Sequence, residues 1–148
     1  MASGLFNAAR QRFLRAGIDW EDDDIDCLLV DDTYTFDEAD EYVSDVAAKE
    51  CGATDYARVS VSSRTVSDAT TTVVDCGDIT FAGLGGASNE TVGGAILFKN
   101  SGTDYDGGTI NADANRPVIC FVDHTDFTTA DQDYTLVVPA GGLFDWAG

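Results

Sequence analysis

Positive charge is scarce in this sequence. Its 148 residues carry 8 Lys plus Arg against 27 Asp plus Glu, which gives a formal net charge of −19. A surface that docks on a nucleic-acid backbone would have to overcome repulsion from the rest of the chain, so the composition disfavours DNA and RNA as partners. Long apolar runs are also missing, and no stretch approaches the roughly 18 uncharged apolar residues of a membrane helix. We therefore expect no nucleic-acid partner and no membrane partner.

A secretory signal is not visible in residues 1–20, which have neither an apolar run of about 7–15 residues nor a small-residue cleavage site. We therefore expect a cytoplasmic product. The length fits a single domain over 1–148, and a chain of this size buries enough surface to fold without disulfides or a metal ion.

The acidity has an uneven composition and an uneven distribution. Asp outnumbers Glu 22 to 5, and Arg outnumbers Lys 6 to 2. Residues 1–18 contain three arginines and no acid, whereas thirteen acids and no base lie between Arg15 and Lys49. In about 1 M salt the screening length falls to roughly 3 Å, which removes most of the self-repulsion. Two interpretations stay open: adaptation to the brine of a halophile, or a device for solubility.

The N-terminal segment 1–17 predicts a helical anchor. A helix is expected over about 4–16, starting at Ser3 as N-cap and ending before Gly17. Its apolar stripe consists of Leu5, Phe6, Ala9 and Phe13. Its flanks carry Arg10, Arg12 and Arg15. Because a helix this short is marginal alone, either the domain itself or a partner protein must cover the stripe.

Residues 25–148 predict a β-rich body. The apolar run 25–30 has the length of an interior strand, and alternation over 57–62 indicates another. Further strands are expected over 64–67, 71–76, 78–81, 92–99, 117–123, 132–138 and 142–146. A second helix is expected over about 36–48. Because helices lead and strands follow without βαβ alternation, the sequence predicts a mainly β fold, an antiparallel β-sandwich or barrel-like sheet with two helical segments.

Two glycine-rich insertions, 82–90 and 100–115, are expected to project as loops between strands. The first contains GLGGAS at 83–88. It lacks the lysine of a phosphate-binding loop and leads into a strand-like segment, so we expect a flexible hairpin loop and no phosphate site.

The cysteines and the single histidine offer little chemistry. The four cysteines are Cys27, Cys51, Cys76 and Cys120. No two of them have the C-x-x-C spacing, so we expect reduced structural thiols and no zinc or redox centre. Three disulfide pairings remain open if the thiols meet air. His124 lies between Asp123 and Asp126, which could orient an imidazole, but no activated nucleophile accompanies it. The sequence therefore predicts no catalytic residue and no enzyme.

The acidic loops are a candidate for calcium. Residues 104–113 and 22–24 supply oxygen ligands, but their spacing departs from the EF-hand pattern. We expect solvated acidic loops without a cofactor, and keep Ca²⁺ as an alternative.

Five segments together resemble a family of small virion-associated structural proteins of tailed bacteriophages and archaeal tailed viruses. They are MASGLFNAARQRFLRAGIDW (1–20), DIDCLLVDDTYTFDEADEYVSDV (24–46), TVSDATTTVVDCGDITF (65–81), GGAILFK (93–99) and RPVICFVD (116–123). The motifs are apolar and positional, so the resemblance implies a shared fold and a structural role in the particle. Two features depart from it: relatives carry Phe-Gly where this chain has His124-Thr125, and the 100–115 loop is longer and more acidic.

The resemblance and the charge together predict a capsid decoration or cement protein. Strong negative charge suits the outer face of the capsid better than the side that faces packaged DNA. The expected partners are the major capsid protein or other virion proteins, with homo-oligomerisation, after assembly in the host cytoplasm. The predicted interface residues are Leu5, Phe6, Arg10, Arg12, Phe13 and Arg15. Two alternatives remain: a tail or head–tail connector protein, and a host-glycan-binding β-sandwich whose aromatics would be Tyr105 and Trp146.

Overall fold

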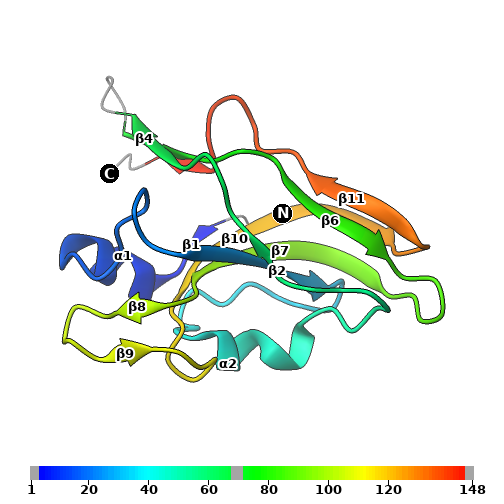
Figure 1. Ribbon diagram of the computed structural model, residues 1–148, viewed down its shortest axis with the longest axis horizontal. Helices are drawn as coiled ribbons and strands as arrows, with labels where there is room; N and C mark the ends of the chain where they lie inside the picture. Colours follow the sequence, from blue (N-terminus) through cyan, green and yellow to red (C-terminus); the bar gives the residue numbers. More distant parts are fainter. Residues whose placement is uncertain (1–3, 68–71, 146–148) are drawn as a thin grey trace.

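The computed structural model describes residues 4–67 and 72–145 and has a mainly β fold with antiparallel sheets and two short α-helices. Its central sheet has the strand order β1-β10-β7-β2-β3 (Figure 1). The bounds are β1 (Gly4–Leu5), β2 (Ile25–Asp31), β3 (Val59–Ser60), β7 (Thr91–Lys99) and β10 (Val118–Thr128). The prediction of a sandwich-like or barrel-like antiparallel fold is confirmed.

Strand β7 lies at the centre of this sheet. Its Leu97 pairs with Cys27 of β2 on one side and with Cys120 of β10 on the other. Paired residues point to the same face, so these three side chains enter one side of the core together. Every residue from Cys27 to Val30 is buried, as expected for a strand covered on both faces.

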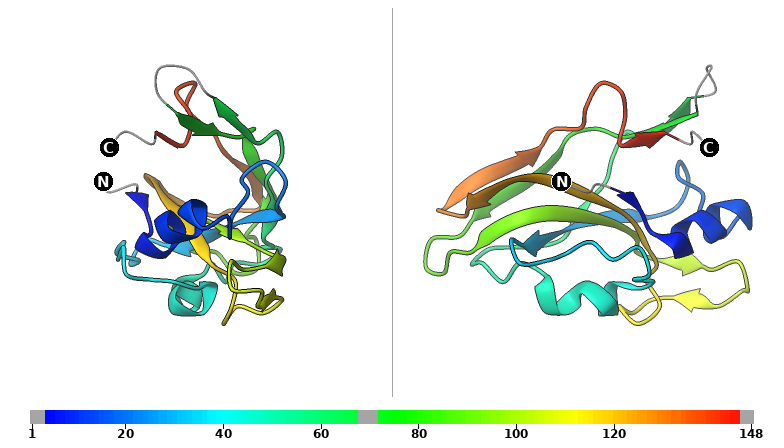
Figure 2. Two further views of the ribbon diagram at one scale, coloured as in Figure 1. Left: turned by 90° about the vertical axis from the view of Figure 1, so that its left-hand side faces the viewer. Right: turned by 180° about the vertical axis from the view of Figure 1, so that it is seen from behind.

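A second β layer covers one face of the central sheet (Figures 1 and 2). Strand β6 (Ile79–Leu84) pairs with β11 (Gln132–Leu136), and β5 (Val73–Asp75) pairs with both β4 (Thr65–Ser67) and β12 (Phe144–Asp145). The buried side chains of Phe81, Leu84 and Leu136 come from this layer. They close the core against the central strands.

The other face is covered by non-β segments. Helix α2 (Val43–Val46) and the 3₁₀ helix η1 (Ala47–Lys49) lie below the sheet, and α1 (Asn7–Leu14) packs against β10 (Figure 1). The rings of Phe36 and Phe121 stack 5.6 Å apart, so the segment before α2 also contributes to this cover. Strands β8 (Gly102–Thr103) and β9 (Thr109–Ile110) form a separate hairpin near α1.

Both predicted helices are shorter in the structure. The first begins at Asn7, because residues 4–5 pair with β10 and the Phe6 N–H donates to the Ile119 carbonyl at 3.1 Å. Of the predicted 36–48 helix only α2 and η1 are helical. Tyr42 forms an antiparallel bridge with Pro117, and the carboxylate of Asp45 accepts the Tyr42 N–H at 2.9 Å, which starts the helix there.

The predicted strands agree with the observed strands in position, but several differ from them in length. All of the expected strand segments contain a strand, but β10 continues to Thr128 and β3 is reduced to two residues. The β8–β9 hairpin lies inside the 100–115 segment that was expected to be a loop. The predicted N-cap Ser3 and the candidate aromatic Trp146 lie outside the described residues.

Candidate functional site

The apolar stripe of the predicted anchor belongs largely to the domain's own core. Phe6 and Ala9 are fully buried, and the Phe6 ring meets Phe36 at 5.0 Å. Leu5 and Phe13 are half-buried against the same core, with Phe13 contacting Phe144 at 6.4 Å between ring centroids. The domain therefore covers the stripe, and Phe6 is not available to a partner.

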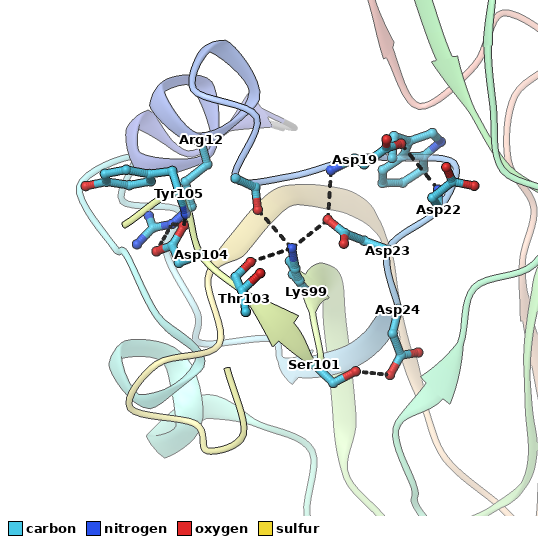
Figure 3. A network of polar contacts seen from close by, with 12 residues as sticks. Arg12, Asp19, Asp22, Asp23, Asp24, Lys99, Ser101, Thr103, Asp104 and Tyr105 are labelled. Carbon is cyan, nitrogen blue, oxygen red and sulfur yellow. Dashed lines mark hydrogen bonds and ion pairs between the residues drawn. The ribbon is translucent and has the colours of Figure 1, made fainter. Parts of the chain in front are cut away.

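Arg12 is also buried, contrary to its predicted place in the interface. Only 2% of the residue is exposed. Its Nε donates to Asp104 at 3.0 Å (Figure 3). Its Nη2 donates to Glu41 at 3.0 Å and to the Tyr42 hydroxyl at 3.1 Å. These contacts raise the pKa of Arg12 against the opposing effect of burial, so the guanidinium stays charged. The side chain holds α1 to the rest of the fold.

Lys99 forms a second buried anchor beside Arg12. Its Nζ lies 3.0 Å from the Gly17 carbonyl, 2.9 Å from the Thr103 carbonyl and 2.7 Å from the Asp23 carboxylate (Figure 3). Three acceptors satisfy the three donors of an ammonium group. All three N–H donors of Lys99 are used within the protein, so this lysine stabilises the fold and has no donor left for a ligand.

The acidic loops use their carboxylates within the protein. Asp113 lies 2.7 Å from Arg58 and 2.8 Å from Arg116. Hydrogen bonds from Arg58, and then from Arg116, lower the pKa of Asp113 to about 2. In the loops for which calcium was the alternative, Asp104 binds Arg12 and Asp24 accepts from the Ser101 hydroxyl. Within residues 4–67 and 72–145, no three His, Cys, Asp or Glu residues are arranged to hold a metal ion.

The other candidate residues are packed or covered. The His124 ring lies 5.3 Å from Tyr134 and 5.7 Å from Phe127, and its Nδ1 is 3.1 Å from the Thr125 carbonyl. His124 therefore belongs to an aromatic cluster between β10 and β11. Tyr105 is 43% exposed, but the Arg15 guanidinium lies 4.9 Å from its ring centroid. That contact occupies one face of the ring that a sugar would need.

All four cysteines are free and buried. Burial raises the pKa of Cys51 to about 11 and that of Cys76 to about 12, and it also raises those of Cys27 and Cys120. The thiolate is the reactive form, so these thiols are poor nucleophiles in the folded protein.

The C-terminal end of α1 presents the most exposed apolar side chain among the described large hydrophobic residues. Leu14 is 78% exposed, and Val66 of β4 is 40% exposed. Both line a groove of about 420 Å³. The other lining residues are Phe13, Ala16, Ile18, Asp19, Trp20, Thr72 and Val74. The sequence pattern placed Leu14 in the predicted helix but not among the interface residues. Only the packing of Phe6 and Phe13 shows which side of α1 faces solvent.

Two exposed arginines lie near Leu14 in the chain, one in α1 and one directly after it, although neither lines the groove. Arg10 precedes Leu14 by one helical turn, and its side chain is 48% exposed, with Glu38 at 3.7 Å. Arg15 follows Leu14 and is also exposed. We define the docking surface as Arg10, Leu14, Arg15, Val66 and the groove between α1 and β4. It combines apolar area with positive charge on a chain that is otherwise strongly acidic.

Comparison with protein-family models, with curated proteins and with solved structures gives no match. Within the part of the chain that the structure describes, no helix is long and apolar enough to cross a membrane.

Proposed function

We propose that this chain is a non-enzymatic structural component of a tailed-virus particle, a capsid decoration protein on the outer shell. The docking surface around Leu14 would hold it to the major capsid protein or another virion protein. The observation that supports this proposal most directly is that Leu14 is 78% exposed beside the apolar groove. An exposed apolar patch with a polar rim is typical of a protein–protein contact.

Charge favours an acidic partner for this surface. Arg10 and Arg15 lie on either side of Leu14, while the chain as a whole carries −19. An acidic shell would therefore attract this end of the molecule and repel its remaining surface, which fixes orientation. Leu14 and the groove would supply the buried apolar contact at the centre, where binding energy concentrates.

The test compares Leu14→Asp with Val137→Asp. Val137 is 67% exposed and lies after β11, away from the groove residues, so it is a matched control. Both variants should keep the circular dichroism spectrum and melting temperature of the wild type. Leu14→Asp should be lost from purified particles, and Val137→Asp should be retained. A folded Leu14→Asp protein at full copy number in particles would contradict the proposed docking.

Copy number separates decoration from the connector alternative. A decoration protein is present on the order of hundreds of copies per particle, whereas a ring at the head–tail junction holds about six or twelve. Quantitative mass spectrometry of purified particles gives the count. Absence of the chain from particles would overturn the virion assignment as a whole.

A further inference from the structure

A second cavity, of about 330 Å³, lies between segment 32–36 and strands β7 and β10. It shares no lining residue with the docking surface. Three rings form its apolar part: Tyr34, Phe36 and Phe121. The Tyr34 ring meets Phe121 edge-on at 5.2 Å, and the Tyr34 hydroxyl donates to Asp40 at 3.0 Å, which fixes the ring.

Carboxylates form the polar part of this cavity. Asp32, Asp123 and Asp126 line it, and no Lys or Arg is among its eight lining residues. Thr35 and Gly93 complete the lining. Asp32 and Asp126 are exposed, so their charge faces the opening. The site therefore combines π faces with negative charge.

Two glycines of β7 allow the residues beside this cavity to pack closely against the strand. A Cβ at Gly93 would lie 2.8 Å from the Asp32 Cα and 3.2 Å from Asp126 Oδ1. A Cβ at Gly94 would collide with the ring of Phe121. Glycine inside a strand weakens it unless something approaches the backbone closely. Gly94 admits the Phe121 ring, and Gly93 lets the Asp32 backbone and the Asp126 carboxylate approach β7 closely.

We propose that this cavity, the aromatic–acid pocket, binds a guanidinium group. A guanidinium is planar and weakly hydrated, stacks on aromatic rings, and donates paired hydrogen bonds to carboxylates. The half-buried rings of Tyr34 and Phe36, supported by Phe121, and the Asp32 and Asp126 carboxylates supply both kinds of contact in one space. Its volume is within the range of small-ligand pockets, which begins at about 300 Å³. This site is independent of the docking surface.

The test follows backbone amide shifts of Gly93, Gly94 and Phe121 by NMR during titration in low salt. N-acetyl-arginine amide should give saturable shifts at these amides. Its neutral isostere N-acetyl-citrulline amide should give none, and N-acetyl-lysine amide should bind more weakly. Equal binding of the citrulline or the lysine compound would overturn the assignment.

Charge variants separate a specific pocket from general attraction to a polyanion. Asp126→Asn and Asp32→Asn should each weaken binding by about fivefold, as expected for an exposed ion pair. Asp22→Asn removes one charge from an exposed turn outside the pocket and should leave the affinity unchanged. Equal weakening by Asp22→Asn and Asp126→Asn would mean non-specific attraction only and would overturn the proposal.

The source of the guanidinium is distinguished by a second pair of probes. Tighter binding of the tripeptide Gly-Arg-Gly than of methylguanidinium would assign the pocket to an arginine side chain of a protein. Equal or weaker binding of the peptide would assign it to a free guanidinium compound. Both results support the pocket, and saturable binding of neither probe would overturn it.

Discussion

Arg12 and Asp104 form a largely buried ion pair with 3.0 Å between Nε and Oδ2, although 92 residues separate them in the sequence. Their side chains are 3% and 13% exposed. The pair ties α1 to the segment between β8 and β9, and Glu41 adds a second carboxylate to the same guanidinium. An arginine that looks suited to a partner therefore stabilises the fold.

Replacing Arg12 should destabilise the protein. Arg12→Met leaves the Asp104 carboxylate without its cation, and we expect a loss of about 3 kcal/mol in the free energy of unfolding. Urea denaturation measures this change. Arg10→Met is the matched control in the same helix, and its exposed, 3.7 Å contact with Glu38 should contribute less than about 0.5 kcal/mol. Equal effects of the two variants would contradict the role given to Arg12.

Lys99 should be coupled energetically to Asp23. Lys99→Met leaves the Gly17 and Thr103 carbonyls without their donor, so we expect a loss of about 3 kcal/mol in stability. A double-mutant cycle with Asp23→Asn should give an interaction energy of about 1–3 kcal/mol. Lys49→Met, whose ammonium donates to the exposed Thr33 hydroxyl at 2.6 Å, serves as control. Additive effects of Lys99→Met and Asp23→Asn would contradict the pairing.

Acid should weaken the contacts of Asp113. Its pKa in the folded protein is about 2, below the usual value of 3.8, so the carboxylate stabilises the fold above about pH 4. That contribution is lost as the pH falls from about 4 towards 2. The stability difference between wild type and Asp113→Asn, measured by urea denaturation, should therefore be largest at pH 5 and shrink by pH 2. A difference that stays constant between pH 5 and pH 2 would contradict the pairing of Asp113 with Arg58 and Arg116.

The four thiols should resist modification in the native state. All are buried with raised pKa values, so reaction with Ellman's reagent at pH 8 should wait for unfolding. Four thiols should appear in 6 M guanidinium chloride, about the concentration that unfolds even very stable domains. A rapid native reaction of one or more thiols would show that the core opens more easily than its packing indicates.

Phe13 and Leu14 should behave oppositely although they are neighbours. Phe13→Asp places a charge against the core and Phe144, and we expect a loss of about 3 kcal/mol or more in stability. Leu14→Asp replaces an exposed side chain and should change stability by less than about 0.5 kcal/mol. Thermal denaturation compares the two. If the Phe13→Asp variant is missing from particles, misfolding explains the loss. Only Leu14→Asp tests docking separately from folding.

The strands could be predicted because their signals are local. The run 25–30 is apolar except for Asp26 and becomes part of β2, in which Cys27 to Val30 are all buried. The end of β10 could not be predicted, since its residues beyond Asp123 rejoin β7 only after a bulge that ends at Phe127. That pairing depends on register with a distant strand, and nothing in 117–128 alone encodes it.

The helices and the candidate site depend more on distant contacts. Residues 36–42 have helical spacing, but the Phe36 ring contacts Phe6 and Phe121, and Tyr42 bridges to Pro117. The charge pattern distinguishes the basic N-terminal segment from the acidic remainder. It could not show that Asp104 lies beside Arg12, so the spacing alone placed a buried guanidinium in an interface.

The position of β7 between β2 and β10 has a consequence for how the sheet comes apart. The outer edge of β2 pairs with β3 only at Asp26 and Cys27, and that of β10 pairs with β1 only at Cys120 and Phe121. Strand β7, by contrast, is paired along both of its edges by longer strands. Its amide hydrogens should therefore exchange with solvent more slowly than those of β2 and β10 outside these short pairings.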